Sequence, residues 1–243
     1  TTANFDSTVL AQSQATSLAE LLNEHSTAHI KAYGNGMLSS ISFRGTGPEH
    51  TAVLWHGVNI SYPMLGQTDF SLLPMALYDK LLIQHGTGSS LYGSGALGGT
   101  IALEAGQPQS GTSLGISQWL GSFGSFGNSL HVSHATEHYF IEVNTLWDKA
   151  ENNFAFQNTS KPGAPDEIQE NAAYGQLAFG LESGIKFKQN SELLISAQYL
   201  DMERELQPSI NVAQSDDFQN DNNLRVRARY LVKGRSTNGY LQY

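Results

Sequence analysis

One stretch decides the fold: Leu91-Tyr92-Gly93-Ser94-Gly95-Ala96-Leu97-Gly98-Gly99-Thr100-Ile101. It places glycine and serine between the apolar run 81–83 and the strand-like segment 100–103. Glycine is costly in regular structure and is tolerated where the chain bends sharply or where another backbone comes close. So dense a cluster inside a well-patterned region predicts a compact domain threaded through a tight space.

Composition narrows the class of protein. The 243 residues fit one large or two small domains, and 22 acidic residues against 13 Lys and Arg disfavour nucleic acid as a partner. The absence of cysteine excludes disulfides and thiolate metal sites. No apolar run approaches the roughly 18 residues of a spanning helix, but barrel strands carry only alternating hydrophobicity. The chain does not begin with Met, which we interpret as a processed or truncated start.

Residues 1–108 are expected to form a small α+β domain. Three leucines recur at helical spacing, at positions 18, 21 and 22, and Ser17 precedes them as a candidate cap. The expected strands are short apolar segments separated by glycine-rich loops: 41–43, 52–55 and 81–83.

Residues 109–243 have a different pattern and are expected to form about seven strands. Apolar and polar residues alternate with a period of two in segments such as 141–148, 192–199 and 224–232. The connections differ in length: short near 135–138 and 233–236, modest near 121–127, medium near 183–190, and long at 151–171 and 201–223. Short turns at one end and long loops at the other are typical of a bacterial outer-membrane barrel. Seven strands cannot close such a barrel, so we expect the chain to be a piece of a longer protein.

A soluble β-sandwich is the alternative, because its strands also alternate. Its apolar face would be a buried core, whereas that of a barrel would face lipid. Loop asymmetry and strand length favour the barrel. The arginines at 225, 227 and 229 do not decide, since a water-filled lumen and a solvated sheet face would both accept them.

Four motifs resemble elements of the TonB-dependent outer-membrane transporter family. Three resemble elements of its plug: Leu38–Gly45 the S-I-x-x-R-G element, Thr51–Ile60 a strand, and Gly86–Ile101 the closing glycine-rich element. The fourth, Asn152–Phe156, is similar to a motif of an early external loop. Their order and spacing make the resemblance specific, and the resemblance covers the whole chain. The resemblance implies an α+β plug domain followed by the opening antiparallel strands of a transmembrane β-barrel, which has about 22 strands in this family.

Within the family, segments 34–40 and 43–46 look most like the cobalamin (vitamin B12) transporters. Segment 63–70 resembles relatives from Bacteroidetes-type bacteria. The implied function is TonB-coupled uptake of a scarce nutrient across the bacterial outer membrane, cobalamin first. A ferric-siderophore or heme receptor, a non-transporting receptor-like subunit of a cell-envelope complex, and a secreted β-rich binding module remain as alternatives. The sequence offers no supported catalytic arrangement or phosphate-binding loop, so we expect no enzyme.

The resemblance also implies a ligand site on the outer loops of the plug. Its candidate residues are Tyr33, Gly34, Asn35, Gly36, Met37, Asn59, Ser61, Tyr62, Met64, Leu65 and Gln67. Amides and hydroxyls beside Tyr, Met and Leu suit a large amphipathic ligand.

Plug–barrel contacts are expected from Arg44 and His85, with Glu142 as one inward-facing candidate partner of Arg44. Leu82 and His85 stand where the family often has Glu and Arg, which departs from its pattern. The expected partners are a TonB-type inner-membrane protein, outer-membrane lipid, a small ligand such as cobalamin and a surface lipoprotein.

No cofactor is expected. The acidic loop residues Asp166, Glu167 and Glu170 are weak calcium candidates, because calcium prefers several oxygen ligands. Their spacing matches no defined calcium loop, and a solvated charged loop is the simpler interpretation.

Overall fold

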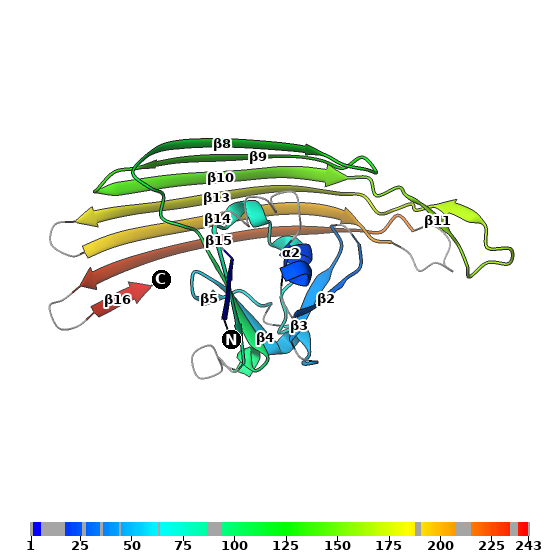
Figure 1. Cartoon of the computed structure of the whole chain (residues 1–243), viewed down its shortest axis with the longest axis horizontal. Helices are drawn as coiled ribbons and strands as arrows, with labels where there is room; N and C mark the ends of the chain where they lie inside the picture. The colour runs from blue at the N-terminus through cyan, green and yellow to red at the C-terminus, as the bar shows by residue number, and fades with distance from the viewer. Residues whose placement is uncertain are drawn as a thin grey trace. The chain divides into compact units, whose positions relative to one another are not determined.

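The computed structural model describes residues 2–5, 18–25, 28–34, 36–43, 45–62, 64–86, 94–187, 191–207, 215–233 and 238–242. The chain forms two compact units, Thr1–Gly106 and Gln107–Tyr243 (Figure 1). Within the described ranges, no helix has the length and apolarity needed to cross a membrane.

The N-terminal unit is built on a five-stranded sheet with the order β1-β6-β7-β4-β5. Strands β4 and β7 are parallel and the other neighbours are antiparallel. The bounds of these strands are β1 Thr2–Phe5, β4 Thr51–Trp55, β5 Val58–Asn59, β6 Lys80–His85 and β7 Gly99–Glu104. A separate hairpin joins β2 (Ala28–Ala32) to β3 (Ser39–Phe43). The helices are α2 (Leu18–His25) and the 3₁₀ turns η1 (Pro48–His50), η2 (Phe70–Leu72), η3 (Met75–Leu77) and η4 (Ser94–Ala96).

Apolar side chains from these elements fill one core. All five residues of β4 are buried, and the three leucines of α2 that gave the helical spacing are at most 2% exposed. Strand β3 is buried at every second residue, so only one of its faces contributes. Each fully buried Leu, Ile or Phe stabilises the fold by about 1.5–3 kcal/mol relative to its exposed state. The helix and the strands expected in this unit are therefore confirmed.

Glycine is required where β7 begins. A Cβ on Gly99 would lie 2.7 Å from Cδ2 of Phe43 and 3.0 Å from the backbone oxygen of Gln84. A Cβ on Gly98 would lie 2.5 Å from Oγ1 of Thr46. The close approach inferred from the glycine-rich stretch is real at these two positions. Residues 87–93 of that stretch lie outside the described residues.

The C-terminal unit is a seven-stranded antiparallel sheet with the order β16-β15-β14-β13-β10-β9-β8, as the alternating pattern predicted (Figure 1). The bounds are β8 Gly111–Leu120, β9 Phe126–Ala135, β10 Tyr139–Ala150, β13 Tyr174–Phe187, β14 Ser191–Glu205, β15 Phe218–Lys233 and β16 Asn238–Gln242. A small hairpin of β11 (Ala155–Gln157) and β12 (Asp166–Ile168) lies between β10 and β13 in sequence.

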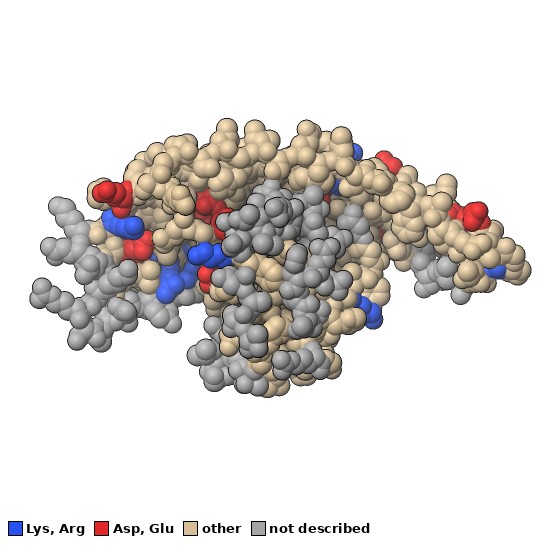
Figure 2. All heavy atoms as spheres, viewed as in Figure 1, with Lys and Arg blue, Asp and Glu red and all other residues tan. Residues whose placement is uncertain are grey.

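One face of this sheet is apolar and exposed, and we call it the outer face. Strand register aligns Leu114, Val132, Val143, Leu181 and Val226 in one row across it, and the two end members are 67% and 65% exposed. Figure 2 shows the convex side of the sheet mostly in tan, with charged side chains toward the strand ends. Contiguous exposed apolar surface marks contact with lipid or a partner. The sandwich alternative required a buried apolar face and is wrong.

The height of the apolar band fits a bilayer. On β10 it runs from Tyr139 to Trp147, which are 46% and 44% exposed. Eight residue steps span about 27 Å along a strand, and a tilt of about 40° reduces this to about 21 Å. That height is close to the roughly 25 Å apolar band of outer-membrane barrels.

The opposite, inner face carries buried polar side chains such as Glu142 and Gln198, together with Leu200 and Met202. The strands extend further than the sequence pattern predicted. The expected medium connection at 183–190 is short, because β13 continues to Phe187 and β14 begins at Ser191. The expected long connection at 201–223 shrinks, because β14 continues to Glu205 and β15 begins at Phe218. At 201–223, backbone pairing continues beyond the apolar band, where most outward side chains become polar and the alternation can no longer be seen in the sequence. At 183–187 the alternation itself continues, with Ile185 and Phe187 on the outer face.

Candidate functional site

Two loops of the N-terminal unit carry the predicted ligand residues. The first loop links β2 to β3. It is closed by hydrogen bonds from the backbone N–H of Tyr33 to the oxygen of Leu38 (3.2 Å) and from that of Met37 to the oxygen of Gly34 (3.1 Å). Gly34 and Gly36 have φ angles of 136° and 72°, a region that side-chain-bearing residues rarely adopt. Glycine at these positions therefore sets the shape of the loop.

The second loop, residues 60–68, follows β5. The backbone N–H of Tyr62 donates to the oxygen of Gln67 (3.0 Å), and that of Gly66 donates back to Tyr62 (2.8 Å), with Gly66 at a φ of 64°. Oδ1 of Asn59 accepts from the backbone N–H of Ser61 (2.9 Å). The loop is thus a folded turn held by its own backbone.

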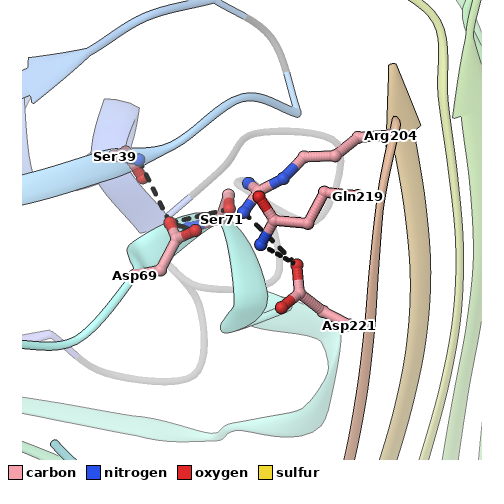
Figure 3. Close-up of polar contacts among 6 residues, drawn as sticks. All are labelled: Ser39, Asp69, Ser71, Arg204, Gln219 and Asp221. Atoms are coloured by element: carbon pink, nitrogen blue, oxygen red, sulfur yellow. Dashed lines mark hydrogen bonds and ion pairs between the residues drawn. The ribbon is translucent and has the colours of Figure 1, made fainter. Parts of the chain in front are cut away.

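Asp69 ties the two loops together. Its Oδ1 accepts from the backbone N–H of Ser39 (3.1 Å), where the first loop ends, and from the backbone N–H and Oγ of Ser71 (3.0 and 2.7 Å) (Figure 3). The carboxylate is 7% exposed and caps the 3₁₀ turn η2. Asp69 is not among the residues predicted for the site, although an Asp before Phe70-Ser71-Leu72 is a recognisable capping signal. The two predicted loops therefore share one buried anchor.

The joined loops expose apolar side chains. Met64 is 97% exposed, Leu65 64% and Tyr33 54%. Leu38, which is not one of the predicted residues, is 42% exposed. Met37 is buried, at 6%. Five other predicted residues lie on the same loops: Gly34, Gly36, Ser61, Tyr62 and Gln67. Asn59 is the last residue of β5, directly before the second loop. Asn35 lies outside the described residues. Apolar tips beside amides and hydroxyls can hold a ligand that has both apolar and hydrogen-bonding surfaces.

The residues predicted to join plug and barrel are placed only in part. Arg44 lies outside the described residues, and the ring of His85 packs edge-on against Phe43, with 5.0 Å between ring centroids. Glu142 is 2% exposed on the inner face, and its Oε1 accepts from Nδ2 of Asn144 (2.8 Å). Both roles, for Arg44 and for His85, stay predictions.

Side-chain amides tie together the strand ends at the side of the long connections. The backbone N–H of Asn152 donates to the oxygen of Phe123 (3.1 Å), and its Nδ2 donates to the oxygen of Ala172 (2.8 Å). Asn171 makes similar contacts, because its Nδ2 donates to the backbone oxygens of Leu206 and Asp217. The first residue of the Asn152–Phe156 motif therefore holds neighbouring strand ends together, a role that a single sequence could not reveal.

The inner face near this end carries an ion pair. Nη2 of Arg204 lies 3.3 Å from Oδ2 of Asp221, which also accepts from Nε2 of Gln219 (2.8 Å) (Figure 3). Arg204 is 3% exposed, so its charge needs a paired carboxylate.

The calcium candidates gain no support from their contacts. The Glu167 carboxylate accepts from Asn158 and Lys161, and these hydrogen bonds lower the pKa of Glu167 below its usual value, that of Asn158 contributing most. Within the described ranges, no three His, Cys, Asp or Glu side chains are grouped to hold a metal ion. Calcium binding by Asp166, Glu167 and Glu170 stays a prediction.

Comparison with known proteins gives the family of the N-terminal unit. Residues 1–100 match the model of the TonB-dependent Receptor Plug Domain. The vitamin B12 transporter BtuB of Vibrio cholerae is 35% identical over 116 residues, covering 46% of this chain and 19% of that protein. The vitamin B12 transporter BtuB of Photobacterium profundum is 34% identical over 88 residues, covering 36% of this chain and 14% of that protein. The matched region therefore spans about a fifth or less of the length of these relatives.

Solved structures match the whole architecture. The ferripyoverdine receptor of the outer membrane of Pseudomonas aeruginosa has a TM-score of 0.73 at 14% identity, covering 96% of this chain and 32% of that one. The ferric enterobactin receptor PfeA of Pseudomonas aeruginosa has a TM-score of 0.71 at 16% identity, covering 100% and 40%. At these identities the likeness concerns the fold.

The matched relatives are named as transporters and receptors, which agrees with the expectation of no enzyme at that coarse level. The expected link to Bacteroidetes proteins has no support in these matches and stays a prediction. The plug match, the exposed apolar outer face and the shared architecture agree with one another. Residues 1–100 thus match the TonB-dependent Receptor Plug Domain, and the chain as a whole shares the fold of the corresponding part of these outer-membrane receptors.

Proposed function

We propose that the protein takes up a corrinoid of the cobalamin class across the outer membrane, with energy from a TonB-type inner-membrane protein. The observation that carries the proposal is the pair of plug loops anchored at Asp69, which expose Tyr33, Met64 and Leu65 beside amide and hydroxyl groups. A corrinoid has a large apolar ring system rimmed by amides, and such a surface fits these side chains.

The relatives support this choice of ligand over others. Both BtuB proteins described above are named vitamin B12 transporters, and both are at least 34% identical to this chain over the matched region. The matched length of 88 to 116 residues is comparable to that of the plug. The loops proposed to bind the ligand lie within residues 1–100, which match the plug-domain model.

Coupling follows from two plug states. Ligand bound to the outer loops favours the state in which the N-terminal end of the plug is presented to the inner-membrane partner. A ligand shifts such an equilibrium only by the difference between its affinities for the two states. The outer face of the sheet contacts lipid, and a surface lipoprotein is a further partner in this proposal.

A ferric siderophore is the second candidate ligand, because the matched structures include receptors named for ferripyoverdine and enterobactin. Heme stays a third candidate, on the sequence resemblance alone. Direct binding separates the three. The full-length gene product, purified in detergent, is titrated with cyanocobalamin, a ferric siderophore and heme. Saturable binding of cyanocobalamin is expected. Binding of a ferric siderophore alone would transfer the proposal to that ligand.

The loop residues are tested by the double change Tyr62→Ala and Met64→Ala. Cyanocobalamin affinity should fall about tenfold or more, the equivalent of about 1.4 kcal/mol, because two apolar contacts are lost. The change Lys80→Ala, on an exposed plug residue outside both loops, is the control. Equal affinity and uptake in the loop variant and the control would remove Tyr62 and Met64 from the site.

A further inference from the structure

One methionine of the chain differs from the other three in its surroundings. Met64 is 97% exposed on the second plug loop, whereas Met37, Met75 and Met202 are 6%, 4% and 1% exposed. All four methionines of the sequence lie in the described ranges, and the sequence has no cysteine. Methionine and cysteine carry the sulfur atoms that mild oxidants attack. Met64 is therefore the one sulfur-bearing side chain of this sequence that is open to solvent.

The loop around Met64 is held by backbone hydrogen bonds. The carbonyl oxygen of Tyr62 accepts from the backbone N–H groups of Leu65 (3.2 Å) and Gly66 (2.8 Å), and the N–H of Tyr62 donates to the oxygen of Gln67 (3.0 Å). These bonds join residues on both sides of Met64. So exposed a side chain buries little apolar surface against the rest of the plug and adds little to its stability. A chemical change at the sulfur would therefore leave the fold of the loop in place.

A peroxide would change the chemistry of this loop at one side chain. The thioether sulfur of Met64 gains one oxygen atom, the O–O bond of the peroxide breaks, and water or an alcohol leaves. The sulfur is oxidised by two electrons, and the peroxide is reduced by two. The product is a sulfoxide, which is polar and chiral where the thioether was flexible and apolar. The neighbouring Leu65, 64% exposed, has no sulfur and keeps its apolar surface.

We propose that Met64 is an oxidant-sensitive site, at which a peroxide forms the sulfoxide and thereby weakens ligand binding by the second plug loop. The effect on binding rests on the proposed function, whereas the selective oxidation of Met64 does not. Placing the polar sulfoxide against the apolar surface of a ligand removes water from its oxygen, which is unfavourable. Methionine sulfoxide reductases restore the thioether, so the change is reversible.

Peptide mapping tests the selectivity. The full-length protein, purified in detergent, is treated with hydrogen peroxide, and the sulfoxide content of each methionine peptide is followed by mass spectrometry. Met64 should be oxidised about tenfold or more faster than the three buried methionines, because a buried sulfur reacts only after local opening. Oxidation of Met37, Met75 or Met202 at the rate of Met64 would overturn the proposal.

Binding before and after treatment tests the consequence. The ratio of the cyanocobalamin dissociation constants after and before peroxide is measured for the parent, Met64→Leu and Met75→Leu. We expect a ratio of about three or more for the parent and for Met75→Leu, the matched control. The ratio for Met64→Leu should be close to one, because leucine has a similar apolar volume and no sulfur. Methionine sulfoxide reductases A and B should return the parent to its starting affinity.

Two results would overturn the effect on binding: no loss of affinity in the treated parent, or an equal loss in the parent and in Met64→Leu. Failure of the proposed function gives a different result. If the untreated parent binds none of cyanocobalamin, a ferric siderophore and heme, the proposed function is refuted together with the effect on binding. The mass-spectrometric rates still decide whether Met64 is oxidised selectively.

Discussion

The anchoring role of Asp69 gives the sharpest prediction for the plug. Replacing Asp69 with Ala removes an acceptor shared by the backbone N–H of Ser39, the backbone N–H of Ser71 and the hydroxyl of Ser71. The hydroxyl of Ser71 can rotate to water, because Ser71 is partly exposed. The backbone N–H of Ser39 has no such alternative, because Ser39 is only 3% exposed. One orphaned buried donor and one lost cap together cost about 2–4 kcal/mol.

The destabilisation caused by Asp69→Ala should appear as more frequent local opening of both loops. A change of 2–4 kcal/mol corresponds to roughly 30- to 1,000-fold faster amide exchange wherever exchange proceeds through that opening. Hydrogen–deuterium exchange with mass spectrometry of the full-length protein should show this acceleration in segments 33–43 and 59–73 at once. Asp69→Asn retains an oxygen at the same position, so its effect should be several-fold smaller.

The control for this experiment is Lys80→Ala, which removes an exposed charge of the same unit outside both loops. It should leave both segments unchanged. Exchange in Asp69→Ala within about threefold of the parent in either segment would show that the anchor does not hold that loop. An effect confined to residues 69–73 would restrict Asp69 to capping η2.

Two further predictions follow from close contacts. Gly99→Ala should destabilise the plug by about 2 kcal/mol, since the new Cβ would lie 2.7 Å from the ring of Phe43. The loss is measured by urea unfolding, with amide exchange of segment 99–104 as the signal. The contact of Glu167 with Asn158 and Lys161 should weaken as pH falls below the ordinary glutamate value of 4.5, because the lowered pKa of Glu167 means that the ionised form is the one stabilised. Amide exchange of segment 155–168, corrected for the intrinsic effect of pH, follows this opening.

Each of these has a matched control. Gly175→Ala adds a methyl group where no atom lies within 4 Å, and it should change stability by less than about 0.5 kcal/mol. Asp166→Asn alters the neighbouring acid and should leave the pH response of the hairpin in place, whereas Glu167→Gln should abolish it. Equal stability of the two alanine variants, or a pH response that survives Glu167→Gln, would contradict the contact geometry.

Much of the fold was predictable because local patterns reflect local burial. The helical spacing of the leucines at 18, 21 and 22 predicted α2, and period-two alternation predicted the strands of the large sheet. Sequence alone left the sandwich and the barrel both open, because alternation says that one face is apolar but not what covers it. The exposure of Leu114 and Val226 decided between them.

Strand length was the main error, and its cause is physical. Residues 201–205 and 218–223 continue the backbone ladder, with Asp201 opposite Asn222 and Glu203 opposite Asn220. Apart from Phe218, their outward side chains are polar, so the alternation that marks a lipid-facing strand disappears there. Backbone hydrogen bonds do not require apolar side chains, and the strands continue where the sequence pattern suggests a loop.

By itself, the sequence determined two units of different pattern, the glycines that a tight junction requires, and the loops on which a ligand site was to be sought. Only the tertiary structure brought Asp69 to Ser39, 30 residues away. A polar residue seen in sequence gives its chemistry but not its partner. Partners are set by strand register and chain reversal, which depend on the packing of the whole unit and not on neighbours along the chain.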